Sequence, residues 1–108
     1  QAVPIAGAIA AQVPSLIEKE GLEPGHIWKL SGDEIRIGRK RDENDIVLKG
    51  LSASRFHATI NLTSNGYILK TLNPNNPTYV NDQPITDQVV LTNGDVIKIG
   101  ESEFLFEG

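Results

Sequence analysis

Short runs of β-branched and aromatic residues recur along most of this chain, and turn-forming residues separate them. The runs that we expect to form strands are residues 26–30, 34–38, 45–48, 55–62, 67–71, 78–80, 89–91, 96–99 and 103–106. Glycine, proline, asparagine and aspartate fall between these runs, with the spacing that is typical of a β-sandwich or barrel. No stretch after residue 20 has the periodicity of a long amphipathic helix. The pattern therefore predicts an all-β domain.

The run over residues 55–62 alternates apolar and polar side chains. Its apolar set is Phe56, Ala58, Ile60 and Leu62, and its polar set begins with His57. Successive side chains of a strand point to opposite faces of the sheet. We therefore expect the apolar set to face the core and His57 to lie on the other face.

The first twelve residues differ from the rest of the chain. They are rich in alanine and uncharged, which is typical of a linker or a flexible extension, with a brief helical turn as an alternative. No basic stretch precedes them, which argues against a secretory signal. The apolar pair within residues 15–19 is too short to distinguish a helical turn from a first strand. We expect a linker over residues 1–12 and a folded domain over residues 13–108.

Size and charge narrow the class of protein. The 108 residues suffice for one domain with its own core. A net charge of −4 argues against binding to nucleic acid or to an anionic membrane surface. The absence of cysteine excludes disulfides and thiolate chemistry and fits a reducing compartment such as the cytoplasm. No apolar run approaches the roughly 20 residues that insertion across a bilayer requires. Because methionine is also absent, we expect the chain to be part of a longer protein.

Two strand ends suggest an anion site. The run at 34–38 ends on Gly38 and is followed by Arg39, and Ser54 opens the approach to the next long run. A phosphorylated side chain carries about −1.5 to −2 charge and three acceptor oxygens. The planar donor fork of an arginine suits such an anion better than a lysine does. We expect Arg39 and Ser54 to form the site, with Gly38 allowing a sharp turn behind Arg39. Taken alone, Ser54 fits equally well a serine that stabilises a turn.

Four motifs occur in a recognisable order. They are Gly38-Arg39, SRFH from Ser54 to His57, NPTYVND from Asn76 to Asp82, and LTNGDVIKIG from Leu91 to Gly100. In this combination the chain resembles a forkhead-associated (FHA) domain over roughly residues 14–107. The resemblance implies an eleven-strand β-sandwich that binds phosphothreonine through loops at one end. It also implies a non-catalytic adaptor without a cofactor, whose partner is a threonine-phosphorylated protein or peptide.

The resemblance extends to residues near the phosphate. The phosphate-binding residues that it implies are Arg39, Ser54 and Asn75. Arg55 occupies a variable position beside the serine, where it either adds a second cation to the site or is a solvated surface charge. Lys40 and Arg41 extend a basic loop that in the family can contact residues C-terminal to the phosphothreonine. Taken singly, each of these two also fits a charge that only serves solubility.

Other residues are implied to hold the peptide or the loops. Asn76 and Asn81 match asparagines that bind the peptide backbone, a role that suits the paired donor and acceptor of an amide. For Asn81 the alternative is that it braces its loop. Pro77 stands where family members usually carry glycine, and proline fixes φ near about −65° and removes an N–H. The implied role of His57 is architectural, with its ring nitrogens bonded to loop backbone.

Other kinds of function are less well supported. The acidic run at 42–45 continues into apolar residues where an EF-hand needs a glycine and a further oxygen ligand, so we expect no metal. No nucleophile and base stand out as a pair, which argues against an enzyme. Trp28, Phe104 and Phe106 fit a core better than a surface that stacks bases. The remaining alternative is a phosphate-independent interaction or structural β-sandwich domain. We expect the isolated domain to be monomeric.

Overall fold

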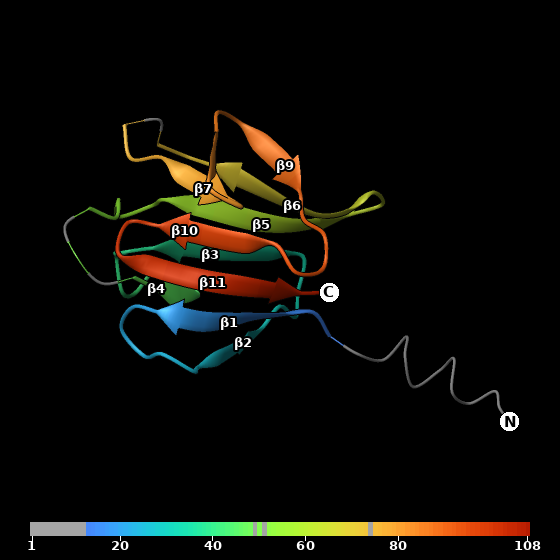
Figure 1. The fold of residues 1–108 in the computed structure, drawn as a ribbon, viewed down its shortest axis with the longest axis horizontal. Coiled ribbons are helices and arrows are strands. Elements are labelled where there is room, and N and C mark those ends of the chain that lie inside the picture. The colour runs from blue at the N-terminus through green and yellow to red at the C-terminus, as the bar shows by residue number, and fades with distance from the viewer. Residues whose placement is uncertain (1–12, 49, 51, 74) are drawn as a thin grey trace, which may run out of the picture.

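The computed structural model of the protein describes residues 13–48, 50, 52–73 and 75–108. The linker predicted over residues 1–12 lies outside the described residues. The strands are β1 (Ser15–Glu20), β2 (Ile27–Lys29), β3 (Glu34–Gly38), β4 (Ile46–Val47), β5 (Ala58–Thr63), β6 (Gly66–Thr71), β7 (Thr78–Val80), β8 (Gln83–Ile85), β9 (Gln88–Val90), β10 (Val96–Ile99) and β11 (Ser102–Glu107). They form two sheets that pack face to face (Figure 1). The eleven-strand β-sandwich implied by the resemblance is confirmed.

The order of the strands places sequence-distant segments side by side. One sheet has six strands in the order β2-β1-β11-β10-β7-β8, and the other has five in the order β4-β3-β5-β6-β9. The described strand pairs are antiparallel except for the short pair of β3 and β4, which is parallel. Because β3 and β5 are antiparallel neighbours, the end of β3 lies beside the start of β5. This arrangement joins the two strand ends on which the anion site was predicted.

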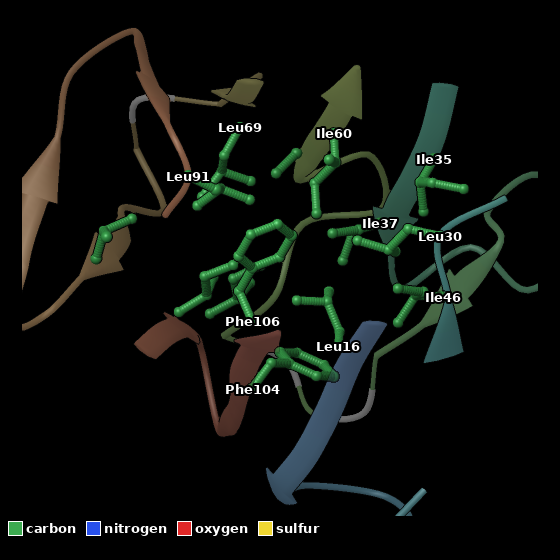
Figure 2. Close-up of a cluster of buried hydrophobic side chains, with 14 of the residues drawn as sticks. Leu16, Leu30, Ile35, Ile37, Ile46, Ile60, Leu69, Leu91, Phe104 and Phe106 are labelled. Atoms are coloured by element: carbon green, nitrogen blue, oxygen red, sulfur yellow. The ribbon is translucent and has the colours of Figure 1, made fainter. Parts of the chain in front are cut away.

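The core lies between the two sheets and is built by inward-facing residues of their strands, together with Leu30, Leu48, Ala53 and Leu91 from the connections. Figure 2 shows the cluster, whose members from both sheets point toward one another. The buried apolar residues are Leu16, Leu30, Ile35, Ile37, Ile46, Leu48, Ala53, Ala58, Ile60, Leu69, Val80, Leu91, Ile97, Ile99, Phe104 and Phe106. Trp28 is half-buried and packs against this cluster. Burying one large aliphatic or aromatic side chain contributes about 1.5–3 kcal/mol, so the cluster gives the loops a rigid base.

The strand predicted over residues 55–62 is wrong at both ends. Strand β5 begins only at Ala58. Ala58 and Ile60 face the core as predicted, whereas Phe56 is 44% and Leu62 is 45% exposed. His57, which the alternation placed on the face opposite this set, is also wholly buried. The alternation fails at Phe56 and His57 because residues before Ala58 belong to a loop, so their side-chain directions do not follow the period of a strand. Leu62 lies within β5, in the last part of the strand, which is exposed.

Several smaller differences concern the short strands. Residues 15–19, for which a helical turn was the alternative, lie in strand β1 and pair with both β2 and β11. Strand β8 was not predicted, because its three residues Gln-Pro-Ile carry no alternation. It lies at an edge of the six-stranded sheet, where a proline is tolerated because no neighbour needs its N–H. No helix of the described residues is long and apolar enough to cross a membrane.

Candidate functional site

The loops that follow β3, β4 and β6 gather at one end of the sandwich, on the left in Figure 1. Backbone hydrogen bonds tie the first two loops together. The Arg39 N–H donates to the Ser54 carbonyl at 2.9 Å, and the His57 N–H donates to the Ile37 carbonyl at 2.9 Å. The antiparallel pairing of β3 and β5 thus continues beyond the strands and sets Arg39 beside Ser54.

The Arg39 side chain is exposed, and one hydrogen bond to another described residue orients it. Its Nε donates to the Ala53 carbonyl at 3.0 Å. Neither an ion pair nor another side-chain hydrogen bond engages Arg39 within the described part of the chain. A guanidinium offers five N–H donors in a fixed plane. The contact with Ala53 therefore orients the group, and the four N–H donors on its two terminal nitrogens stay available to an anion.

Ser54 is buried and joins three segments. Its carbonyl accepts from Arg39, and its N–H donates to Nδ1 of His57 at 3.0 Å. Its hydroxyl oxygen accepts from Nδ2 of Asn76 at 2.6 Å. The hydroxyl proton has no acceptor among the described residues, so it can donate to a ligand. We call Arg39, Ser54 and Asn76 the loop cluster.

Asn76 belongs to the β6–β7 loop, and Asn73 shapes that loop. The Asn75 N–H donates to the Asn73 side-chain oxygen at 2.9 Å, and the Asn76 N–H donates to the Asn73 carbonyl at 3.2 Å. Such a bond from an asparagine side chain to the backbone two residues later is a common turn device. Asn73 was not assigned a role from the sequence, although an asparagine before a proline is a turn signal. Asn75 is exposed next to the cluster.

His57 lies beneath the loop cluster and is wholly buried. Its Nδ1 accepts the Ser54 N–H, so the neutral ring carries its proton on Nε2. Nε2 lies by the backbone of Asn76 and Pro77 but makes no well-formed hydrogen bond within the described part of the chain. Burial lowers the pKa of His57 from its ordinary 6.5, and the nearby backbone of Pro77 and Asn76 offsets only part of this effect. The ring therefore supports both binding loops in its neutral form.

We expect the free energy of unfolding to fall as the pH is lowered through about 6.5. The unfolded chain binds a proton on His57 at the ordinary pKa of 6.5, whereas the folded protein binds it only at lower pH. Between these two pKa values the unfolded state carries more protons, so acidification favours unfolding. Urea unfolding at a series of pH values measures the effect. The variant His57→Ala keeps the exposed His26 and should lack this dependence, and a wild-type curve that is flat across the range would contradict the prediction.

Gly38 is required for close packing rather than for a turn. It does not adopt a positive φ, so the explanation by a sharp turn is wrong. A Cβ atom on Gly38 would collide with the Arg55 carbonyl oxygen and would lie 2.8 Å from its carbon and 2.9 Å from Nδ2 of Asn44. The absent side chain thus lets the backbone that carries Ser54 lie directly against the end of β3. Sequence alone does not reveal which segment packs there.

Asn44 is a bridging residue that the sequence analysis missed. Its Nδ2 donates to the Lys40 carbonyl and to the Arg55 carbonyl, both at 2.8 Å. One side chain therefore closes the β3–β4 loop and ties that loop to the segment that carries Ser54. The acidic run around it gave no signal, because the role depends on contacts with residues distant in sequence.

Replacing Asn44 by alanine should lower the free energy of unfolding by about 1–2 kcal/mol, since two hydrogen bonds to backbone carbonyls are lost. Affinity for a phosphothreonine peptide should fall a few-fold as well, because the Ser54 segment loses a tether. Urea unfolding and peptide titration measure the two effects. Asn65→Ala is the matched control, since Asn65 is exposed in the β5–β6 turn and its side chain forms no hydrogen bond within the described part of the chain. Equal stability of the two variants would contradict the bridging role.

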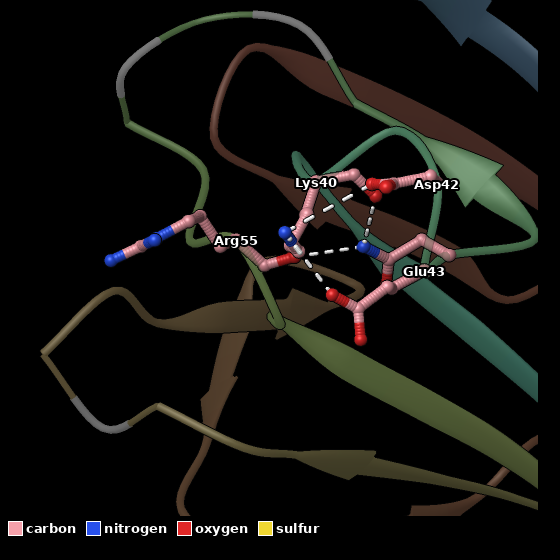
Figure 3. A network of polar contacts seen from close by, with 5 residues as sticks. Lys40, Asp42, Glu43 and Arg55 are labelled. Carbon is pink, nitrogen blue, oxygen red and sulfur yellow. Dashed lines mark hydrogen bonds and ion pairs between the residues drawn. The ribbon is translucent and has the colours of Figure 1, made fainter.

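Among the described residues of this end, Lys40, Arg41 and Arg55 differ in whether a carboxylate neutralises their charge. Lys40 forms ion pairs with Glu43 at 3.1 Å and with Asp42 at 4.0 Å. Figure 3 shows Lys40 turned toward these carboxylates, while Arg55 points away from them. Arg55 and Arg41 are exposed and form no ion pair in the described residues. The acidic run therefore offsets Lys40, and the positive charge of Arg55 stays beside Ser54.

Asn81 lies apart from the loop cluster. It sits in the β7–β8 turn with a φ of 52°, at the end of β7 that is opposite the β6–β7 loop. Its Nδ2 donates to Asp95 at 2.9 Å, and its Oδ1 accepts the Val96 N–H at 3.0 Å. Both halves of the amide thus hold the turn to the start of β10. Of the two roles predicted for Asn81, its contacts match bracing rather than peptide binding.

The loop cluster lies at the surface, where Arg39 is exposed and Asn76 is half-buried. A hollow of about 440 Å³ exists, but it lies at the opposite end of the sandwich, among Val13, Lys29, Asn93 and Glu107. No group of three or more histidine, aspartate or glutamate residues that could hold a metal ion occurs within the described ranges. An open surface with charged and amide groups is suited to an extended peptide, which binds along a surface rather than inside a pocket.

Comparison with known proteins establishes the family. Residues 35–100 match the FHA domain, and the chain belongs to the FHA family. It is 39% identical over 83 residues to the transcriptional regulatory protein EmbR of Mycobacterium tuberculosis, which is 77% of this chain and 21% of EmbR. The chain thus spans about a fifth of that relative.

Solved structures agree with this assignment. A structure of M. tuberculosis EmbR in complex with a low-affinity phosphopeptide matches with a TM-score of 0.80 and 32% identity, over 94% of this chain and 29% of that one. A structure from work on phosphothreonine-dependent FHA domain interactions matches with a TM-score of 0.78 and 30% identity, over 90% of this chain and 97% of that one. The fold is therefore that of FHA domains.

Proposed function

We propose that this chain is a non-catalytic module that binds phosphothreonine in a protein partner and acts as a signalling or assembly adaptor within a longer protein. The observation that carries the proposal is the loop cluster. The fork of Arg39 is oriented by Ala53 and has no carboxylate partner among the described residues, and it lies beside a serine whose hydroxyl proton is available. Arginine and hydroxyl donors converging on one surface match the three acceptor oxygens of a phosphorylated side chain.

Each residue of the site has a separate proposed role. Arg39 and the Ser54 hydroxyl bind the phosphate, and Arg55 adds a second positive charge from the solvent side. The Asn76 side-chain oxygen accepts no hydrogen bond from the described residues, so it can accept an N–H of the peptide backbone while its nitrogen stays on Ser54. Asn75 approaches the phosphate from the exposed tip of the loop. Arg41 and Lys40 flank the site, where Lys40 is already paired with acids.

The solved structures that are similar to this chain support the proposal. The EmbR structure contains a phosphopeptide, and the second structure comes from work on phosphothreonine-dependent interactions. We propose a cytoplasmic location, since EmbR is a transcriptional regulator. We propose no enzymatic role, because Nδ1 of the buried His57 accepts the Ser54 N–H, and the Ser54 hydroxyl is bonded to Asn76 rather than to the imidazole.

The experiment is a titration of the domain with two peptides of one sequence, one phosphorylated on threonine and one not. Hydrogen bonds to a charged group contribute about 1.5–3 kcal/mol each, so we expect at least about tenfold tighter binding of the phosphorylated peptide. The NMR chemical shifts of the backbone amides of Arg39, Ser54 and Asn76 should change when the phosphorylated peptide is added. Equal affinity for both peptides would overturn the proposal in favour of a phosphate-independent interaction domain.

A further inference from the structure

A line of aliphatic side chains crosses the outer face of the six-stranded sheet. Strand pairing places Ile17 opposite both Ile27 of β2 and Leu105 of β11, and it places Leu105 opposite Val96 of β10. Residues directly opposite one another in an antiparallel pair point to the same face of the sheet. The four neighbouring strands β2, β1, β11 and β10 (Figure 1) therefore contribute one aliphatic residue each to a single line. We call Ile27, Ile17, Leu105 and Val96 the outer row.

The outer row faces away from the core. The residues that alternate with it on β1 and β11 include Leu16 and Phe104, which are wholly buried between the sheets. Because successive side chains of a strand point to opposite faces, the row lies on the outside of the sandwich. Ile27 is 53% exposed, and the other three residues of the row are half-buried. The sheet thus carries an apolar line on a face that is not part of the core.

Charged residues of both signs border the outer row and balance one another. The chain as a whole has a net charge of −4, whereas lysines and glutamates occur in equal number around the row. An apolar centre with a polar rim is typical of a protein interface. A neutral rim of mixed sign lets the face approach a second copy of itself without net repulsion. The bordering residues are Lys19, Lys29, Lys98, Glu20, Glu103 and Glu107.

The outer row is complementary to itself. A two-fold axis that runs parallel to the strands, between β1 and β11, exchanges these two strands between the copies and exchanges β2 with β10. It therefore brings Ile17 of one copy onto Leu105 of the other, and Ile27 of one copy onto Val96 of the other. Each contact occurs twice, as in any interface that joins identical surfaces by two-fold symmetry.

The charges around the row distinguish this axis from the alternative one. A two-fold axis along the row would set Glu103 of one copy on Glu107 of the other, and like charges opposite one another are unfavourable. With the axis parallel to the strands, Glu107 faces Ser15 instead. Glu103 then faces the bulge of β1, where the charges of Lys19 and Glu20 cancel. The rim therefore selects the axis parallel to the strands.

We propose that two copies of this chain associate through the outer row about a two-fold axis parallel to the strands. Rotation about such an axis leaves the strands of both copies running between the same two ends. The two loop clusters consequently lie at one end of the pair, where they can bind two phosphothreonines of one partner with increased avidity. The association itself needs no phosphate and goes beyond the proposed function, whereas this bivalent binding rests on it.

The size of the face determines how strongly two copies associate. Four strands about 4.8 Å apart, each with about five residues, cover roughly 300–400 Å² of sheet in each copy. Stable complexes bury at least about 1,200 Å² in total, so this contact is weak between free domains. We expect the isolated chain to be a monomer at micromolar concentration and to pair as the concentration approaches about 1 mM. Tethering in a larger assembly raises the local concentration and favours the pair.

Sedimentation equilibrium of the 108-residue chain measures the association. The mean mass should rise toward that of a dimer as the concentration approaches about 1 mM. Leu105→Lys removes an aliphatic contact at two symmetric places and should weaken the association at least about tenfold. Leu62→Lys is the matched control, because Leu62 is 45% exposed on the other sheet, and it should change the association by less than about twofold. Circular dichroism verifies that both variants are folded.

Disulfide cross-linking tests the axis, since the chain has no cysteine of its own. Within one copy Ile27 and Val96 are separated by three strand spacings, about 14 Å. A disulfide needs Cα atoms within about 7 Å, so the two positions cannot be bridged within a copy. In the proposed pair they face each other. Oxidised glutathione should therefore convert the double variant Ile27→Cys/Val96→Cys to a covalent dimer several times faster than either single variant.

Each result bears on a separate part of the proposal. A chain that stays monomeric at about 1 mM, or equal weakening by the two lysine variants, would overturn a second copy as the occupant of this face. Single cysteine variants that cross-link as fast as the double variant would overturn the axis and the placement of both loop clusters at one end. Neither experiment contains a phosphopeptide, so a failure of the proposed function is detected separately by the peptide titration.

Discussion

Replacing Arg39 by alanine should weaken the binding of a phosphothreonine peptide by at least about tenfold, and up to a few hundredfold, while the domain stays folded. The guanidinium has Nε on the Ala53 carbonyl and its remaining N–H donors directed to no group of the described protein. Two hydrogen bonds to a charged phosphate contribute about 1.5–3 kcal/mol each. Their loss accounts for the expected range, since 1.4 kcal/mol is about a factor of ten.

The fold should tolerate this change because Arg39 is exposed and makes one side-chain hydrogen bond. Losing that bond costs about 0.5–1.5 kcal/mol. Arg39→Lys should recover only part of the affinity, because an ammonium keeps the charge but not the planar fork. Ser54→Ala should cost less than Arg39→Ala, because it removes one neutral donor.

Arg36→Ala is the matched control for Arg39→Ala. Arg36 is an exposed arginine in β3, the strand that precedes Arg39, and it is paired with Glu34 at 3.2 Å. Its removal changes the net charge by the same amount, so any difference between the variants reports position rather than charge. Isothermal titration calorimetry of both folded variants with the phosphorylated peptide measures the loss of affinity in each. Equal losses in the two variants would show that Arg39 contributes only general electrostatic attraction.

Replacing His57 by alanine should lower the free energy of unfolding by about 3 kcal/mol. The change leaves the buried Ser54 N–H without an acceptor, which costs about 1–3 kcal/mol. It also removes a wholly buried ring and leaves a cavity, and deletions of this kind in a core cost about 2–5 kcal/mol. The loss corresponds to a decrease of more than about 10 °C in Tm for a domain of this size.

Calorimetry or circular dichroism measures this change in Tm. The comparison variant is His57→Asn, because an asparagine side-chain oxygen can accept the Ser54 N–H as Nδ1 does. It should restore part of the stability without restoring an imidazole. Peptide affinity should fall in His57→Ala because Ser54 loses its support. An unchanged Tm together with abolished binding would instead assign the ring a direct contact with the ligand.

The periodicity and turn residues determined the class of fold. Alternation of apolar residues identified the core positions Ala58 and Ile60, and clustered glycine, proline and asparagine separated the strands. These signals are local, so one sequence suffices to detect them. The pairing of Arg39 with Ser54 was also predicted, because both residues adjoin the ends of predicted strands, although in the structure Ser54 lies in the loop before β5. The alternation failed at Phe56, where a loop replaces the strand and the period no longer holds.

The tertiary structure decided the parts that depend on contacts between distant segments. Gly38 looks like a turn residue in the sequence, and only the approach of the Arg55 backbone shows that its missing side chain makes room for the loop. Asn44 and Asn81 are both asparagines in polar runs, yet one bridges two binding loops and the other braces a turn away from them. An amide can bond many partners, so its identity does not fix its role. That role follows from which backbone groups the two sheets bring within reach.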